Sequence, residues 1–215
     1  MDSLFTILVS IPAILLAFTC HEYAHAKVAD MLGDKTPRFQ GRLTFNPLKH
    51  LDPLGTLLIL IVGFGWAKPV ETNPSAYKNY YMDDLKVSLA GPLTNLLLAF
   101  IGYICYRLFV VVQLQTGIVP GSIIIVLLNM IYAVFTINTM LFVFNLLPLP
   151  GLDGFAVLRD LKPNFFYKIS DSIYKYQMII IILIIFVGSK IIQIPINYIE
   201  VGIATLGNAI LSIFF

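Results

Sequence analysis

Long apolar stretches separated by short polar segments dominate the pattern of hydrophobic positions along the chain. They cover approximately residues 4–20, 54–65, 87–112, 122–147, 176–194 and 196–215. A transmembrane helix needs about 20 consecutive apolar residues, so the pattern predicts four or five membrane spans. The stretch 54–65 is the exception, because as a helix it would reach only about 18 Å across a bilayer core of about 30 Å.

The segment near residues 54–72 is therefore predicted to enter the membrane and return to the same side. Basic residues lie on both sides of its apolar part, with Lys49 before it and Lys68 after it. Irregular backbone at membrane depth persists only where protein or a watery cavity shelters it, so "GFGWAKPV" is predicted to line a cavity. The expected fold is an all-α integral membrane protein, a polytopic helix bundle with a short re-entrant or hairpin-like segment near residues 54–72.

The composition also indicates a membrane protein, and it argues against a soluble domain and against a nucleic-acid-binding protein. Of the 215 residues, 58% are hydrophobic and 12% are charged, against roughly 25% charged in a soluble domain. The net charge of +2 is too small to indicate a nucleic-acid partner. With so much of the chain in lipid, residues 1–215 are expected to form a single domain.

The distribution of basic residues predicts the orientation. None precedes the first apolar stretch, whereas five follow it: Lys27, Lys35, Arg38, Arg42 and Lys49. The positive-inside rule then places the N-terminus outside and the end of the first helix toward the cytoplasm. The last 20 residues follow Pro195 and contain Asn197, Glu200 and Asn208, so the sequence leaves open whether they span the membrane or lie at its interface.

The motif "HEYAH" places ionisable side chains at the end of the first apolar helix. His21 and His25 are four residues apart, so they lie on one face of a helix. In the HExxH pattern two neutral imidazoles bind zinc, and the adjacent carboxylate, here Glu22, is the general base. A catalytic zinc usually takes three protein ligands, and on the spacing alone either His50 or Asp153 could be the third.

An alternative interpretation without a metal ion treats His21 and His25 as buried hydrogen-bonding residues and Glu22 as the partner of a nearby cation such as Lys27. We disfavour it because unpaired acids in lipid are costly and one metal ion explains all three side chains.

Several further motifs follow in order, and together they resemble the site-2 protease family of intramembrane zinc metalloproteases. After "HEYAH" come "NPLKHLDPLG", "GFGWAKPV", "SLAGPLTN" and "NLLPLPGLDG". The resemblance runs from about residue 13 to residue 160 and is greatest to the compact bacterial and archaeal members, which lack PDZ and CBS domains. It implies one zinc ion per chain, with Asp153 as the third ligand.

The resemblance also assigns expected roles to residues around the metal. Asn145 matches a family asparagine near the active site that would bond the substrate backbone or the oxyanion, although it could instead be a helix-packing amide. His50 matches a loop that we interpret as structural or as supporting the ligands. Trp66 belongs to a loop expected to flank the substrate path, although an interfacial anchor would look the same.

The "SLAGPLTN" helix presents a face of small residues at helical spacing: Ser88, Gly91, Asn95, Ala99 and Gly102. Such a face permits close packing against another helix, and the "HEYAH" helix is the expected partner. Asn95 is then either a contact of the active site or part of a structural interhelical hydrogen bond.

The function expected from these features is hydrolysis of peptide bonds within or near the transmembrane segments of single-span membrane proteins. The protein would lie in a prokaryotic cell membrane, in contact with lipid, with its active site toward the cytoplasm. Intramembrane His, Glu and Asp also build the pathways of metal or proton transporters, which is one alternative. A non-catalytic scaffold that binds helices is another.

Overall fold

The computed structural model describes residues 3–62, 65–117, 120–183 and 189–214. Helices account for most of these residues, and the described ranges contain no β-strand beyond one isolated bridge. In chain order the elements are α1 (Ser3–Leu32), α2 (Thr36–Phe39), η1 (Pro47–Lys49), α3 (Pro53–Val62), η2 (Pro74–Ala76), α4 (Tyr80–Thr116), α5 (Ser122–Asn145), α6 (Asp153–Leu161), α7 (Pro163–Leu183) and α8 (Ser189–Leu211).

Four of the described helices are long and apolar enough to cross a membrane. The candidate spans are Phe5–Leu32, Tyr80–Thr116, Ser122–Asn145 and Lys190–Leu211. The expected all-α polytopic membrane protein is therefore confirmed.

One expected span lies partly outside the described residues. The sequence pattern predicted a crossing at 176–194, and the fourth candidate span among the described residues is Lys190–Leu211, in α8. Of the expected crossing, α7 covers the first part and ends at Leu183, residues 184–188 lie outside the described part of the chain, and α8 begins at Ser189. The tail, whose placement the sequence left open, is therefore a candidate span.

Helix α4 is the centre of the bundle and packs against α1, α5, α6 and α8. Small side chains let these helices approach closely: a methyl group on Gly102 of α4 would lie 2.9 Å from the backbone nitrogen of Phe135 on α5. Beside this contact, Ala99, Tyr103, Phe135 and Ile203 form a buried apolar cluster between α4, α5 and α8. Since lipid supplies no hydrophobic force between helices, such close packing is what holds them together.

The segment after α3 returns along its own entry path, as a hairpin-like re-entrant element should. The backbone N–H of Lys68 donates to the carbonyl of His50 at 2.8 Å, and Leu51 and Ala67 form an antiparallel bridge. Glycine permits the approach, because a methyl group on Gly55 would lie 2.9 Å from the backbone nitrogen of Trp66. The predicted hairpin is confirmed, and it brings residues 65–72 beside the end of α1.

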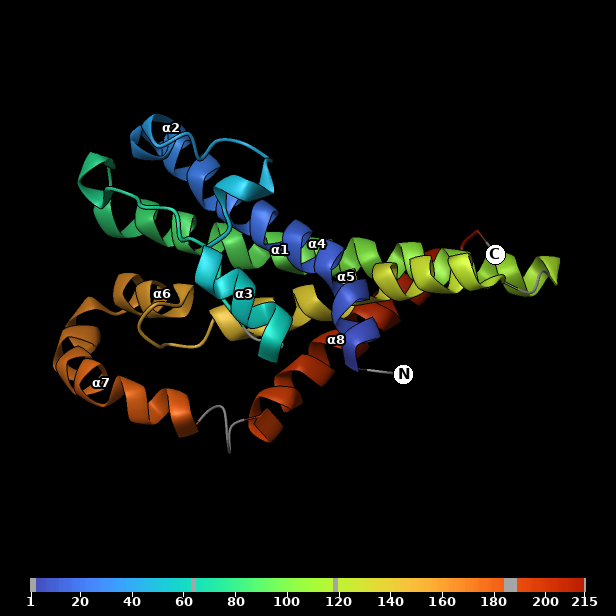
Figure 1. Ribbon diagram of the computed structural model, residues 1–215. Helices are drawn as coiled ribbons and strands as arrows, with labels where there is room; N and C mark the ends of the chain where they lie inside the picture. The colour runs from blue at the N-terminus through green and yellow to red at the C-terminus, as the bar shows by residue number, and fades with distance from the viewer. Residues whose placement is uncertain (1–2, 63–64, 118–119, 184–188, 215) are drawn as a thin grey trace.

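The polar connections gather at one end of the molecule. Figure 1 shows α2, α6 and α7 on the same side of the molecule, with α2 beside the C-terminal end of α1 and with α6 and α7 lower in this view. The "HEYAH" motif lies in the C-terminal part of α1, so the helix that carries it reaches the end where the connecting segments converge.

Candidate metal centre

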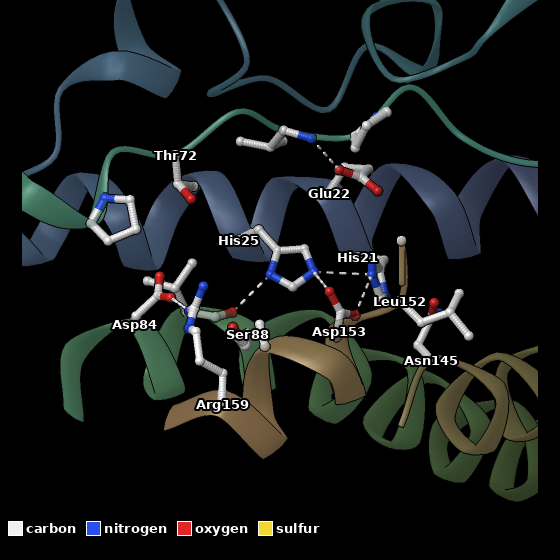
Figure 2. Close-up of a pocket in the computed structure, with 16 residues that line it drawn as sticks. His21, Glu22, His25, Thr72, Asp84, Ser88, Asn145, Leu152, Asp153 and Arg159 are labelled. Atoms are coloured by element: carbon white, nitrogen blue, oxygen red, sulfur yellow. Dashed lines mark hydrogen bonds and ion pairs between the residues drawn. The ribbon is translucent and has the colours of Figure 1, made fainter. Parts of the chain in front are cut away.

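Three side chains from two helices converge beside α4 (Figure 2). His21 and His25 lie one turn apart on α1, both buried, and their Nε2 atoms are 3.0 Å apart. Asp153, the first residue of α6, faces both of them: its Oδ2 is 3.2 Å from Nε2 of His21 and its Oδ1 is 3.3 Å from Nε2 of His25. These three residues are a group that could hold a metal ion.

The tautomers of the two histidines follow from the partners of their other ring nitrogens. Nδ1 of His21 is 2.6 Å from Oδ1 of Asn95, and Nδ1 of His25 is 2.7 Å from the backbone carbonyl of Val87. Both partners accept hydrogen bonds, so each Nδ1 carries the hydrogen. Each Nε2 therefore presents a lone pair toward the same point.

A chain of amides fixes the orientation of Asn95. Its Nδ2 donates to Oδ1 of Asn138 at 2.8 Å, and Nδ2 of Asn138 donates to the backbone carbonyl of Val134 at 2.8 Å. The backbone carbonyl of Val134 can only accept a hydrogen bond, so it fixes which way the side-chain amide of Asn138 points. The amide of Asn138 in turn fixes that of Asn95, whose Oδ1 must then accept a hydrogen from Nδ1 of His21. Asn95 and Asn138 are both completely buried.

The donor set fits zinc. Two lone pairs and a carboxylate aimed at one point repel one another unless a cation lies between them. Zinc binds imidazole nitrogen and carboxylate oxygen at about 2.0–2.1 Å, so the ligand atoms of a tetrahedral site lie about 3.3 Å apart. The measured separations of 3.0, 3.2 and 3.3 Å agree with that geometry.

Glu22 lies on α1 beside the ligands and is oriented by the re-entrant segment. Its Oε2 accepts the backbone N–H of Val70 at 2.8 Å. The buried guanidinium of Arg42 lies 3.8 Å from the same oxygen and donates to the backbone carbonyls of Lys49 and Lys68. Arg42 therefore connects the carboxylate to the chain on both sides of α3, before it at Lys49 and after it at Lys68.

All four side chains line one cavity of about 400 Å³. The re-entrant segment forms one wall through Pro69, Val70 and Thr72, and α4 and α6 form another. Figure 2 shows Glu22 on the side of the re-entrant segment and Asp153 on the side of α6, with the imidazoles between them. The cavity is thus large enough to admit a short length of peptide beside a metal ion.

Of the four other residues singled out from the sequence, two lie at the centre and two do not. Asn145, at the end of α5, lines the cavity, and Asn95 contacts His21. Trp66 is 42% exposed and is not among the lining residues. His50 is fully buried and its Nε2 bonds to the carbonyl of Thr44 at 2.8 Å, so the structure does not bring it to the metal centre.

The environment of His50 suits a structural residue. Burial lowers its pKa from the usual value, so the ring is neutral near pH 7. Its backbone carbonyl accepts the N–H of Lys68. This bond joins the segment before α3 to the segment after it.

Sequence reasoning missed four residues around the centre: Asn138, Arg42, Asp84 and Arg159. Asn138 carried a usable signal, because an amide inside an apolar helix needs a partner. Arg42 was interpreted only as a marker of membrane orientation, and nothing in the pattern indicated that it is buried. Arg159 donates a hydrogen bond to Asp84, and neither residue lies in a motif.

Replacing Asn95 by Ala should weaken zinc binding about 10–100-fold, the usual effect of losing a group that orients a ligand. The imidazole of His21 would lose the acceptor for its Nδ1–H, so both its tautomer and its ring orientation would be freed. Competition with a chromophoric chelator measures the affinity. Asn197→Ala removes an exposed amide bonded to Gln193 and should leave the affinity unchanged. Equal affinities in the two variants would contradict the role of Asn95.

The fold and the centre define a class: a membrane helix bundle in which a HExxH helix and a carboxylate from a second helix, the third candidate ligand, meet in a cavity. The model of peptidase family M50 matches residues 9–188, and the chain belongs to this family, that of the site-2 proteases. It is an intramembrane zinc metalloprotease that acts on membrane proteins.

Three relatives support this assignment. The chain is 44% identical to "Putative zinc metalloprotease YwhC" of Bacillus subtilis over 157 residues, which cover 70% of this chain and 67% of the relative. It is 32% identical to MJ0611 of Methanocaldococcus jannaschii, covering 73% of this chain and 72% of the relative. It is 31% identical to Rip2 of Mycolicibacterium smegmatis, covering 67% of this chain and 54% of the relative. No solved structure matched the chain.

Proposed function

We propose that His21, His25 and Asp153 hold one zinc ion per chain and that Glu22 is the general base of peptide-bond hydrolysis. The observation that carries the proposal is the convergence of two Nε2 lone pairs and one carboxylate within 3.0–3.3 Å. When bound, zinc polarises the substrate carbonyl and lowers the pKa of water toward about 7.

Glu22 is placed to move protons in this reaction. Its carboxylate lies in the cavity next to His21, and the bond from Val70 holds one oxygen, leaving the other free to take a proton from the attacking water. The same carboxyl can then donate that proton to the leaving amine, because a positioned acid–base group serves both steps.

The re-entrant segment is proposed to hold the substrate. A helix that unwinds in the membrane exposes backbone groups that need partners. Residues 65–72 lie beside the centre outside any helix, and a peptide that pairs with them as an added strand would satisfy those groups. Asn145 is proposed to bond the substrate backbone or the oxyanion from the opposite end of the cavity, where Figure 2 places it.

Single-span membrane proteins are the proposed substrates, in contact with this enzyme inside the lipid. The proposed site of cleavage is near the cytoplasmic end of their span, in a prokaryotic cell membrane. The positive-inside distribution supports this orientation, since Lys35, Arg38 and Lys49 follow the "HEYAH" motif. We also propose that residues 1–215 act as one domain.

Zinc removal and reconstitution test the proposal. The protein would be purified in detergent and incubated with a model single-span substrate, before and after treatment with a chelator. Cleavage should disappear on chelation and return with one equivalent of Zn²⁺, and mass spectrometry of the products should place the cut in or near the span. Cleavage that continues after complete removal of zinc would contradict the proposal. Substrate binding without any cutting by the zinc-loaded protein would favour the helix-binding scaffold.

A further inference from the structure

Asp153 is the candidate ligand whose position is least determined by its own helix. His21 and His25 are fixed relative to each other by one turn of α1, whereas Asp153 begins α6, a helix of 9 residues. So short a helix has little stability of its own. The turn before it contains Gly151 at φ +89°, a conformation that L side chains rarely adopt. Contacts from elsewhere must therefore set the distance from Asp153 to the imidazoles.

An ion pair joins the far end of α6 to α4. Nη2 of Arg159 donates to Oδ2 of Asp84, and Nε of Arg159 donates to Oδ1 of Asp160 at 2.8 Å. Asp84 is only 4% exposed and Asp160 only 7%. One guanidinium thus holds buried carboxylates from two helices, and loss of either partner of such a pair leaves a buried charge without compensation.

The same part of α4 also orients a histidine. Val87, whose carbonyl accepts the Nδ1–H of His25, lies three residues after Asp84, and residues three apart lie on one side of a helix. Figure 2 shows Asp84 and Arg159 together at one end of the cavity, beyond His25. One turn of α4 therefore contacts both helices that supply ligands.

Other contacts hold α6 to α7 and to the turn after α5. Phe155 packs against Phe166 and Tyr174 of α7, with ring centroids 4.7 and 5.2 Å apart. At Gly154 the backbone of α6 approaches that of Leu147, where an added methyl group would lie 2.5 Å from the carbonyl oxygen. Helix α6 also packs against α4, and the Arg159–Asp84 ion pair adds a charged link between α6 and this helix, which orients His25.

We propose that Asp84 and Arg159 are positioning residues that hold Asp153 at ligand distance from His21 and His25. The inference rests on the proposed function, because it concerns the same zinc ion. The pair acts through the placement of α6 and takes no part in proton transfer. Its loss is expected to weaken the third ligand while the two histidines stay in place.

Metal binding by the variants Asp84→Asn and Arg159→Gln tests this proposal without an activity assay. Zinc affinity is measured by competition with a chromophoric chelator, and the visible absorption of the Co²⁺-substituted protein reports the number and kind of ligands. Both variants should bind zinc about 10–100-fold more weakly than the wild type. Their cobalt spectra should shift toward that of Asp153→Ala.

Two further variants serve as controls. Lys86→Gln breaks the ion pair with Asp83 on the same end of α4 but leaves α6 untouched, and it should match the wild type in both measurements. Arg159→Lys keeps the positive charge but lacks the planar guanidinium that donates to both Asp84 and Asp160, so it should bind zinc with intermediate affinity. This variant provides the test if a charge-removing variant does not fold.

The outcomes separate this inference from the proposed function. A wild-type protein that binds no metal would overturn both. Zinc affinity and cobalt spectra unchanged in folded Asp84→Asn and Arg159→Gln would overturn the inference alone. So would a rise in KM for the substrate with unchanged metal affinity, because the pair would then be a substrate contact.

Discussion

Replacing Glu22 by Gln should lower the cleavage rate about 10²–10⁴-fold while leaving zinc bound, because this is the usual contribution of a positioned general base. The amide oxygen of Gln can still accept the N–H of Val70, which Oε2 of Glu22 accepts at 2.8 Å, so the side chain should keep its place. It cannot take a proton from water. The cleavage rate is measured with a single-span substrate in detergent, and the zinc content is measured in the same samples.

Asp171→Asn is the matched control for this experiment. It makes the same carboxylate-to-amide change at an exposed position of α7 that does not line the cavity, and it should cleave at the wild-type rate. A Glu22→Gln protein that contains zinc and cleaves normally would show that another group is the base. Loss of zinc together with activity would instead mean that Glu22 maintains the centre.

Replacing Gly91 by Ala should abolish zinc binding, and with it cleavage. The new methyl group would lie 2.6 Å from Nε2 of His21 and still closer to Nε2 of His25, the two atoms proposed to hold the metal. Gly91 lies inside a helix without a left-handed conformation, so Ala suits the backbone and even favours the helix. The expected effect is therefore purely steric. Metal content by mass spectrometry and a cleavage assay measure it.

Gly202→Ala is the control for the steric argument. Gly202 also lies in a helix, α8, but a methyl group there meets nothing within 4 Å. This variant should bind zinc and cleave as the wild type does. Full zinc content in Gly91→Ala would contradict the structure, since the imidazoles would have to lie elsewhere.

The parts of the site that could be predicted are local in sequence. His21 and His25 share a face because they are four residues apart on a helix, and no tertiary contact is needed to see it. The re-entrant hairpin followed from a length argument, since ten residues of α3 cannot cross a bilayer. The third ligand was different: the spacing left His50 and Asp153 open, and the family resemblance favoured Asp153.

The parts that could not be predicted depend on pairing between distant segments. Asp84 and Arg159 are 75 residues apart, and neither lies in a motif. The polar residues of α8 left open, from the sequence, whether this segment spans the membrane. Asn208 is in fact paired within the bundle, where it accepts hydrogen bonds from Tyr103 and Arg107 of α4 at 3.0 Å. Hydropathy cannot anticipate a polar residue whose partner lies on another helix.

The central claim is that two imidazoles and one carboxylate hold a single zinc ion, and X-ray absorption at the zinc edge of the purified wild-type protein tests it most directly. The expected result is one zinc per chain, with only nitrogen and oxygen neighbours at about 2.0–2.1 Å and the outer-shell pattern of two imidazoles. The Asp153→Ala protein should lose one of the oxygen neighbours. A sulfur neighbour at about 2.3 Å, or a first shell unaltered in both Asp153→Ala and His21→Ala, would contradict the assignment of these residues.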